Sequence, residues 1–478
     1  MVPYVPDSSR GPLRLAVLAD SDTRWKWGAL TARRIAPESS VDGFLLRGRA
    51  TPTARQLAET DTGVEEPEEI TAINFLRLIA DLQETDTRNP DKPNKANNTA
   101  KTADNSGEDD APYDALILAC VGGTVQAMLH GLARAWHGTP RRTVVITGYV
   151  GVVYEKLTDG LLLRHGADIV LANSPHDVAR FREQFSGVRA DASAVTECAL
   201  PFLAGAPYDP GAVERGERPY RVVFAVQPSV PGTRKDRAYL LERAVEHARR
   251  HPDREVVLKL RSKPGEHTTH IEELPYQRLA ERIKGETPAN FNLAYGNMGE
   301  VLDGTDLLVT VSSTAALESL HRGIPTAVLS DLGIREQHGN HYFLGSGCFA
   351  SWDELDGGHV PTPDPAWLAD QGLGRDPEAA FAPARERLVT LVEQAAGHGL
   401  PPLDPYYTVR TAPGYLPGVL ARHGLDVKGE PVAGFQGGPD PTTGVRGASK
   451  RLLRRTARGA YRAGVQRVAP LIRRWGQL

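Results

Sequence analysis

Short apolar runs recur through the first 200 residues, and helix-length segments separate several of them. The first run covers residues 13–19, and a segment with helical character follows at 25–35. Further runs lie at 115–120, 143–146, 169–172 and 195–199. Unbroken apolar runs of this length are typical of strands buried on both faces. Their alternation with helices predicts a parallel sheet that is covered by helices on both sides.

The same alternation starts again near residue 220. Strand-like runs lie at 221–226, 255–260, 291–294, 307–311 and 326–329, and helix-like segments at 235–250, 276–284 and 314–322. The Gly- and Pro-containing stretch 203–219 is typical of a domain linker. We therefore predict two doubly wound α/β domains, 1–205 and 206–437, that face each other across a cleft. Ligands of such sheets bind at the carboxyl ends of the strands.

Composition narrows the class of protein. The chain has 478 residues, which exceeds what one hydrophobic core usually organises. A formal net charge of -3 and 40% hydrophobic residues argue against a nucleic-acid binder and against global disorder. The stretch 84–112 has almost no large apolar residue and is expected to be a disordered insertion. Three widely spaced cysteines, no signal peptide and no apolar run of about 20 residues favour a cytoplasmic location.

A hydroxyl-rich segment follows the strand predicted at 307–311. Ser312, Ser313 and Thr314 lead directly into a helix, where small hydroxyl residues can cap the helix, leave backbone N–H groups free and attract an anion. Glu318 lies about one turn later on the same face, so its carboxylate can reach the hydroxyls of a ribose or sugar. The segment therefore predicts a phosphate site, although an ordinary helix cap followed by a solvated Glu318 has the same pattern.

The residues from 312 to 325, SSTAALESLHRGIP, resemble the donor-site motif of GT-B glycosyltransferases. That motif has hydroxyl or Gly residues, a Glu one turn later and then Gly-x-Pro. The segment is also similar to the paired-serine motif of capsular-polysaccharide transferases and CDP-glycerol glycerophosphotransferases. From about Ala19 to Trp367 the chain resembles an actinobacterial family of glycosyltransferases. The resemblance implies a GT-B-like fold of two Rossmann-like domains, with the acceptor in the first and a nucleotide-activated donor in the second.

Cations and imidazoles follow the strand predicted at 255–260. Lys259 and Arg261 stand near its end, and His267 and His270 follow in the next loop. Such groups suit a departing diphosphate, whose charge must be neutralised. The resembled transferases have a His-Pro pair here, whereas these histidines precede Thr and Ile, so the matching histidine stays open. Metal binding by His-x-x-His and a solvated loop are the alternatives, but no third metal ligand stands out and we expect no metal.

The catalytic groups are predicted among Asp20, Asp22 and His267. Inverting transfer needs one carboxylate or imidazole to take the proton of the acceptor hydroxyl, and the two aspartates follow the first strand, where the first domain would face the acceptor. An Asx turn that caps the next helix explains them as well. Gln227 and Asp331, which follow two strands of the second domain, are expected to contact the donor and its sugar hydroxyls.

The end of the chain is strongly basic. Residues 446–474 contain ten Lys or Arg and no acidic residue, and apolar residues from Ala457 to Trp475 fall on one helical stripe. We predict that 438–478 is a basic amphipathic tail whose helix binds an anionic membrane surface through 446–475. Docking on an acidic surface of the same protein is the alternative.

These features together predict a metal-independent GT-B glycosyltransferase. It would need no cofactor and would move a sugar from a nucleotide-activated donor to a glycan or lipid-linked acceptor of the cell envelope, at the inner face of the plasma membrane. The chain lacks a P-loop motif, and its first strand lacks G-x-G-x-x-G, which disfavours ATP hydrolysis and nicotinamide chemistry. The alternatives are a polyol-phosphate transferase, a nucleotide-sugar 2-epimerase, or an inactive binding protein at the membrane.

Overall fold

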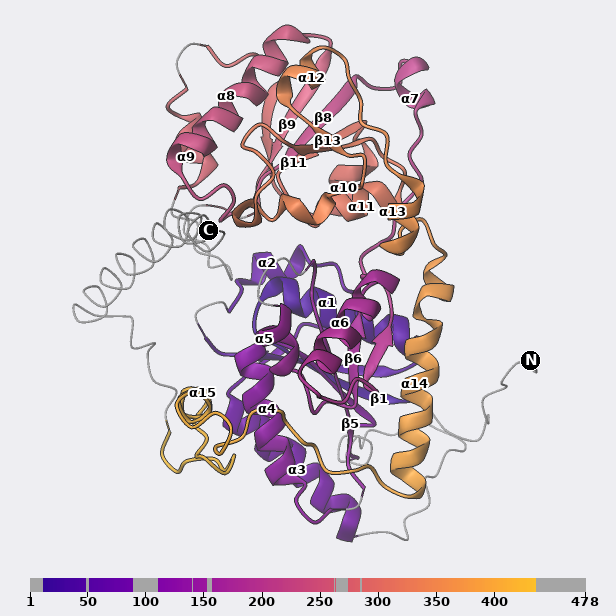
Figure 1. Cartoon of the computed structure of the whole chain (residues 1–478), viewed down its shortest axis with the longest axis vertical. Helices are drawn as coiled ribbons and strands as arrows, with labels where there is room; N and C mark the ends of the chain where they lie inside the picture. The colour runs from indigo at the N-terminus through magenta and orange to yellow at the C-terminus, as the bar shows by residue number, and fades with distance from the viewer. Residues whose placement is uncertain are drawn as a thin grey trace, which may run out of the picture.

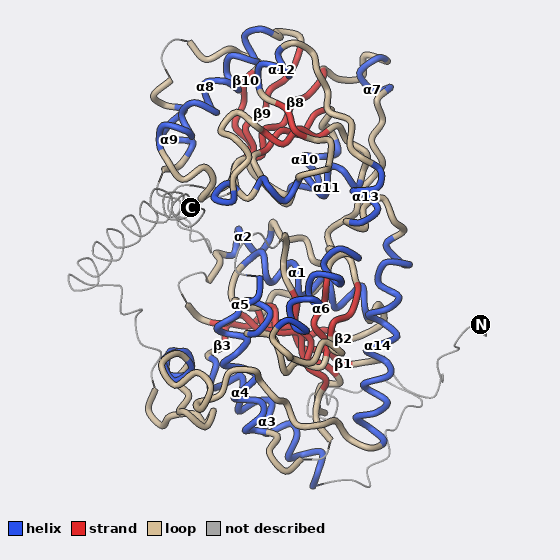
Figure 2. The backbone as a smooth tube through the Cα atoms, viewed as in Figure 1, coloured by secondary structure: helices blue, strands red, loops and turns tan. Residues whose placement is uncertain are grey.

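The computed structural model has two α/β domains arranged along the long axis of the molecule (Figure 1). It describes residues 12–48, 51–88, 111–139, 141–152, 157–261, 263, 274–283 and 286–435. Figure 2 shows the two sheets, each with helices packed against it. The predicted fold class, two doubly wound α/β domains, is confirmed.

The first domain contains a parallel sheet of seven strands in the order β3-β2-β1-β4-β5-β6-β7. The strands are β1 (Arg14–Ala19), β2 (Ser40–Leu46), β3 (Glu68–Ile70), β4 (Ala115–Ala119), β5 (Val144–Gly148), β6 (Ile169–Ala172) and β7 (Val195–Glu197). The helices are α1 (Asp22–Ile35), α2 (Ala54–Ala58), α3 (Ala72–Arg88), α4 (Gly122–Ala135), α5 (Leu157–Leu162) and α6 (Pro175–Gly187). Alternate residues of β1 enter two different cores because helices cover both faces of the sheet.

The second domain contains a parallel sheet of six strands in the order β10-β9-β8-β11-β12-β13. The strands are β8 (Tyr220–Ala225), β9 (Arg254–Lys259), β10 (Phe291–Ala294), β11 (Leu307–Thr310), β12 (Thr326–Leu329) and β13 (Phe349–Ala350). The helical segments are α7 (Gly211–Glu214), α8 (Arg234–Arg250), α9 (Tyr276–Ala280), α10 (Met298–Asp303), α11 (Ala315–His321), η1 (Glu336–His338), η2 (Asn340–Phe343), α12 (Trp352–Asp356) and α13 (Pro365–Asp370).

Both sheets reverse their strand order at the strand that comes first in the chain. β1 lies between β2 and β4, and β8 lies between β9 and β11. At such a switch point the connections leave the sheet in opposite directions, which opens a crevice at the carboxyl ends of the strands. Each domain therefore has a natural binding site at the end of its own central strand.

The chain returns to the first domain after completing the second. α14 (Pro377–Gly397) descends along the side of the first domain (Figure 1) and packs on α1, β5, β6 and β7. Phe381, Ala384 and Leu388 are buried in this contact. α15 (Leu416–Arg422) packs on α4. The structure thus differs from the predicted second domain of 206–437, because an apolar helix face does not specify which of two sheets it covers.

Two predicted segments fall largely outside the described residues. α3 continues to Arg88, so residues 84–88 of the predicted insertion have helical backbone. The rest of that stretch up to residue 110, and the tail predicted at 438–478, lie outside the described part of the chain. Among the helices that the structure describes, none is long and apolar enough to cross a membrane.

Candidate functional site

A cavity of about 870 Å³ lies between the two domains. Its walls come from segments that follow strands of both sheets, which is where the switch points of the two sheets predict a ligand site. The first domain contributes α1, α2 and the residues after β5, and the second contributes the residues after β8, β9, β10, β11 and β12. Among the residues predicted as site residues, the structure brings together Asp22, Gln227, Lys259, Arg261, Ser312, Ser313, Thr314 and Glu318.

Ser312 and Gln227 hold the loop after β11 in place. The buried Ser312 hydroxyl donates to the carbonyl of His338 (2.5 Å), and its backbone N–H donates to Gln227 Oε1 (3.0 Å). The N–H of Ser313 donates to the hydroxyl of Thr310 (3.1 Å), while its own Oγ accepts from the N–H of Ala315 (3.3 Å). These two serines are therefore engaged by the protein itself, whereas Thr314, the N-cap residue of the following helix, makes no side-chain cap hydrogen bond.

Thr314 is the part of this loop that stays available. Neither its backbone N–H nor its hydroxyl makes a hydrogen bond with a described residue, and the residue lines the cavity. Gly151 of the first domain approaches it closely, because a Cβ placed on Gly151 would lie 3.1 Å from Thr314 Oγ1. A backbone N–H and a hydroxyl at the wall of a cavity, with no hydrogen bond to described residues, can donate to a phosphate oxygen.

Lys259 and Arg261 bring positive charge to the same cavity from the end of β9. Lys259 is buried and donates to the carbonyl of Leu260 (2.8 Å), and burial lowers its pKa to about 8. Arg261 reaches across the cleft, where its Nη2 lies 3.4 Å from Asp22 Oδ1 and contacts the hydroxyl of Thr23. A cation of the second domain thus faces a carboxylate of the first.

Glu318 lies one turn into α11 and also lines the cavity. Burial raises the pKa of this carboxyl to about 7, although Lys26, Arg322 and Lys259 act in the opposite direction. Its carboxylate makes no hydrogen bond with the described residues. Glu318 is therefore a half-buried acceptor that makes no hydrogen bond with the described residues, and its binding of ribose or sugar hydroxyls stays a prediction.

The two candidate aspartates have different surroundings. Asp20 Oδ1 pairs with Arg24 of α1 (3.0 Å) and its Oδ2 accepts the N–H of Val121 after β4 (2.9 Å), so both oxygens are used in contacts within the first domain. It does not line the cavity. Asp22 does, from the first position of α1, whose cap is provided by Ser21. Of the two, only Asp22 is placed to meet a substrate in the cleft.

Asp331 lies outside the cavity, contrary to the sequence-based expectation that it meets the donor. It accepts from the hydroxyl of Tyr239 (3.0 Å) and from the N–H of Trp352 (3.1 Å), and so connects α8 to the start of α12. Its place after β12 suggested a ligand contact, but the chain continues from there to η1, which lines the cavity instead. His267 and His270 lie outside the described residues, and their roles stay predictions.

Several residues that line the cavity had no part in the predicted site. They include Lys26 on α1, Gln56 on α2, Glu59 directly after α2, Asn297 after β10 and Gln337 in η1. Asn297 and Gln337 follow strands of the second sheet, so their position at the carboxyl edge was open to prediction. The positions of Gln56 and Glu59 could not be predicted, because the connection that contains α2 has no apolar run that indicates a helix or strand.

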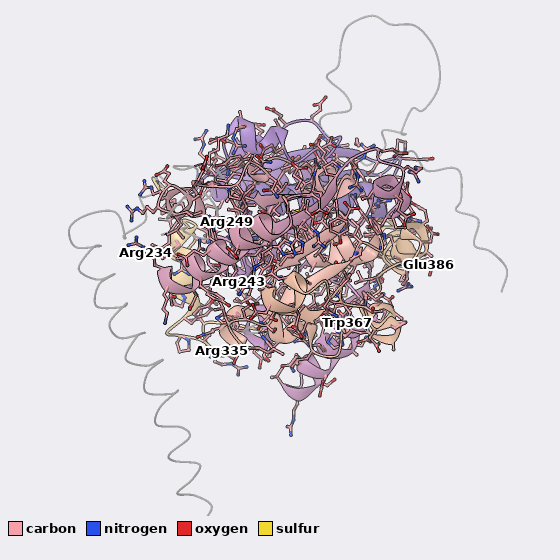
Figure 3. The ribbon with its side chains drawn as sticks, turned by 90° about the horizontal axis from the view of Figure 1, so that it is seen from above. Arg234, Arg243, Arg249, Arg335, Trp367 and Glu386 are labelled. Carbon is pink, nitrogen blue, oxygen red and sulfur yellow. The ribbon has the colours of Figure 1, made fainter. Side chains whose placement is uncertain are left out.

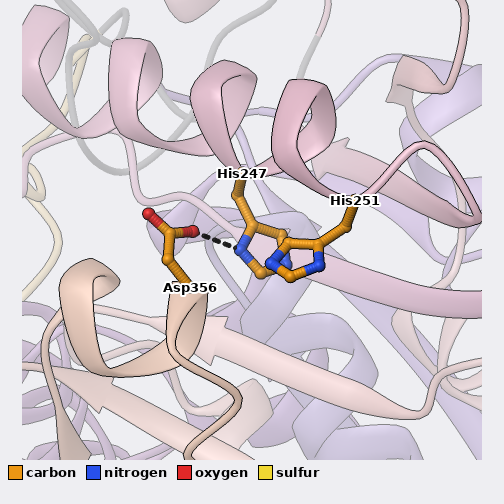
Figure 4. Close-up of side chains that lie close together, drawn as sticks. All are labelled: His247, His251 and Asp356. Carbon is orange, nitrogen blue, oxygen red and sulfur yellow. Dashed lines mark hydrogen bonds and ion pairs between the residues drawn. The ribbon is translucent and has the colours of Figure 1, made fainter.

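A cluster of His247, His251 and Asp356 has the ligand types of a metal site (Figure 4). His247 Nδ1 lies 2.7 Å from Asp356 Oδ1, while Asp356 Oδ2 pairs with Arg243, labelled in Figure 3, and with Arg250. Burial lowers the pKa of His247 to about 4. Two arginines already neutralise the carboxylate and would repel a cation, so this network serves to join α8 to α12.

Two facing Rossmann-like domains with a cavity between their strand ends define a protein of the GT-B-like class. Residues 15–388 match the model of one protein family, described as "Putative glycosyltransferase (DUF6716)". The chain belongs to this family. No curated protein matched the sequence.

The chain also matches solved structures at low sequence identity. A UDP-glucosyltransferase from Polygonum tinctorium is 10% identical, with a TM-score of 0.48 over 81% of this chain and 99% of that one. UDP-GlcNAc 2-epimerase from Neisseria meningitidis, solved with bound UDP-GlcNAc, is 9% identical, with a TM-score of 0.43 over 80% of this chain and all of that one (100%). Both TM-scores lie below 0.5, so the function proposed below rests on the family and on the geometry of the cleft.

Proposed function

We propose that the protein transfers a sugar from a nucleotide-activated donor to a glycan or lipid-linked acceptor of the cell envelope. The observation that carries the proposal is the pairing of Asp22 with Arg261 across one cavity. A carboxylate that can take a proton and a cation that can receive a leaving anion thus face each other from the two domains.

In this proposal the donor binds on the second-domain side of the cavity. Thr314 offers a free N–H and O–H to its phosphates, and Arg261 and Lys259 supply positive charge. Glu318, which makes no hydrogen bond with described residues, would accept from ribose or sugar hydroxyls one helical turn away from Thr314. With these groups in place the protein can neutralise the leaving group by itself, so we expect transfer to proceed without a metal ion.

The reaction needs one base and one stabilised leaving group. Asp22 would accept the proton of the acceptor hydroxyl while that oxygen forms a bond to the anomeric carbon. The bond from the anomeric carbon to the phosphate oxygen breaks in the same step, and its electron pair leaves with the nucleoside diphosphate. Arg261, drawn from Asp22 to the diphosphate, would both stabilise the leaving group and free the carboxylate for proton transfer.

The basic tail supports an acceptor at a membrane. Its cationic, amphipathic sequence over 446–475 is suited to the anionic inner leaflet, where lipid-linked glycans are extended. We propose that the enzyme works in the cytoplasm and binds this surface peripherally. The residues concerned lie outside the described part of the chain, so the support comes from their sequence.

Turnover of nucleotide sugars tests the proposed chemistry. Purified full-length protein is incubated with UDP-, GDP-, CDP- and dTDP-sugars and a membrane lipid extract, and release of free nucleotide is measured. Asp22→Asn should lower kcat by at least about 100-fold, the usual contribution of a general base. Asp253 is exposed and lies directly before β9, at the end of the strand away from the cavity. Asp253→Asn is the matched control and should retain wild-type turnover. Equal activity of Asp22→Asn and wild type would remove Asp22 from the mechanism.

The products separate the alternative reactions. A glycosyltransferase releases a nucleoside diphosphate and needs an acceptor, whereas a CDP-glycerol-type transferase releases CMP. A 2-epimerase converts UDP-GlcNAc with no acceptor present, and an inactive binding protein releases nothing. Turnover that survives EDTA would support the expected independence from metal, and loss of turnover that Mg²⁺ restores would contradict it.

A further inference from the structure

Lys26 is a cation of the first domain that lines the cavity next to the groups of the second. It lies on α1 between Trp25 and Trp27, which are 2% and 1% exposed and anchor the helix in the core. α1 also packs directly on the sheet, because a Cβ at Gly28 would lie only 2.5 Å from Val17 Cγ1. The backbone that carries Lys26 is therefore held at a fixed distance from the sheet.

The ammonium of Lys26 has bonding capacity to spare. Of its three N–H groups, one points to Asn297 Oδ1 at 3.4 Å, the acceptor it contacts among the described residues. That oxygen also accepts the N–H of Gly299 at 3.0 Å as the cap of α10. The contact is thus long and shared, and at least two N–H groups remain for another acceptor.

Lys26 and Glu318 mark the junction of two cavities. A second cavity of about 470 Å³ lies beside the first, and Lys26, Phe202, Asn297 and Glu318 line both. Among the charges that lower the pKa of Glu318 against the effect of burial, Lys26 acts most strongly. A cation of one domain and an acid of the other therefore meet at the end of the cavity where the proposed function places the ribose.

We propose that Lys26 binds a phosphate oxygen of the donor, so that a cation of the first domain completes the donor site. The inference rests on the proposed function, which places the ribose at Glu318 and the diphosphate toward Thr314 and Arg261. Lys26 of the first domain and Arg261 of the second line the same cavity, so a diphosphate bound there can contact both. Affinity for the donor then depends on the two domains being close together, and not on the second domain alone.

Isothermal titration of full-length variants with uridine, UMP and UDP tests this role, with the guanosine or cytidine series used if the wild type binds that base instead. Lys26→Met should weaken diphosphate binding about tenfold, as expected for the loss of one charge-assisted hydrogen bond, and leave the nucleoside within about twofold. Lys26→Arg should recover most of the affinity. Arg77→Met removes an exposed charge on α3 of the same domain, away from both cavities, and should change nothing.

Each other result has its own meaning. If Lys26→Met binds the diphosphate as tightly as the wild type, the inference is overturned. An equal loss for nucleoside and diphosphate also overturns it, because Lys26 would then act through Glu318 on the ribose. A wild-type protein that binds none of the nucleotides removes the proposed donor site itself, whatever Lys26 does. Unfolding temperatures without ligand show whether each variant is folded.

Discussion

Glu318 and Lys259 have pKa values near neutral pH for one shared reason. Burial disfavours the charged form of any group, so it raises the pKa of the Glu318 carboxyl to about 7 and lowers the pKa of the Lys259 ammonium to about 8. The two residues line the same cavity. Both are therefore charged together only in a narrow range of pH.

We expect nucleotide affinity to follow this range. Above about pH 7 Glu318 is ionised and accepts hydrogen bonds from ribose hydroxyls, and below about pH 8 Lys259 is protonated and attracts the phosphates. Affinity should therefore rise with pH through 7, reach a maximum between the two pKa values and fall above 8. Isothermal titration of the diphosphate between about pH 6 and pH 9 measures this profile.

A single variant separates the two limbs of the profile. Glu318→Gln cannot ionise, so its affinity should be lower, should no longer rise through pH 7, and should still fall above pH 8 because Lys259 is unchanged. A rise through pH 7 that persists in Glu318→Gln would assign that limb to another group.

Individual side chains were predicted less well than the motif that contains them. The motif after β11 does line the cavity, yet Ser312 is turned inward to Gln227 and His338, while Thr314 is left free. Asp20 and Asp22 differ in the same way. Neighbouring residues of a loop point in different directions, and that direction depends on contacts with distant segments that the local sequence does not contain.

At the scale of elements, strands with a continuous apolar run were predicted, including the edge strands β7 and β10, and strands without such a run were not. Every apolar run that indicated a strand corresponds to one, from β1 to β12. The missed strands are β2, β3 and β13, which lie at or next to the edge of a sheet. β2 begins with a partly solvent-exposed, polar half, and β3 and β13 have only three and two residues. Such strands are held by pairing with a neighbour, so their own sequence has no strong pattern.

The end of α11 joins both crossings of the chain between the domains. Arg322, next to its last residue, donates to the carbonyl of Ala204 (2.7 Å) and accepts the N–H of Tyr208 at its own carbonyl (2.8 Å), both in the first crossing. His321 Nδ1 accepts the N–H of Gly374 (3.1 Å) in the second. The helix that begins at the proposed phosphate site thus ends at the two segments between the domains.

α14 should stabilise the first domain, to which it returns. Leu388 is fully buried where this helix contacts the first sheet, and Leu388→Ala should lower the free energy of unfolding by about 2–5 kcal/mol, through lost apolar contact and a cavity. Urea denaturation followed by Trp fluorescence reports on it, because Trp25 and Trp27 lie in the same core.

The domain that Leu388→Ala destabilises shows to which domain α14 belongs. If α14 belonged to the second domain, ligand-free Leu388→Ala would leave the unfolding of the Trp25 and Trp27 core unchanged. Val245→Ala, at an equally buried site in the core of the second domain, is the control that should act on that domain instead.

At the scale of the whole molecule, the two facing domains followed from the restart of the strand–helix pattern after a Gly- and Pro-containing linker. The return of α14 and α15 to the first domain did not, because an amphipathic helix specifies an apolar partner but not which one. The position of the cleft between the two domains was therefore predictable from the sequence. The second crossing of the chain, which leads back to the first domain, was not.

The basic tail is expected to govern where the molecule works. Removal of 444–478 should abolish sedimentation with vesicles that contain anionic lipid, because ten cationic residues and the apolar stripe are lost together. Full-length protein should bind anionic vesicles far better than purely zwitterionic ones, and high salt should weaken the binding. Undiminished sedimentation of the truncated protein would assign membrane binding to another surface.

The return of α14 also sets an order for synthesis on the ribosome. The strands β5, β6 and β7 are complete by residue 197, but the helix that covers one face of them is not made until residues 377–397. The first domain must therefore wait, with an uncovered apolar face, while the entire second domain is translated. A gene fragment that stops at the linker should consequently give an aggregating product, and the two halves of this chain cannot be exchanged as independent modules by cutting there.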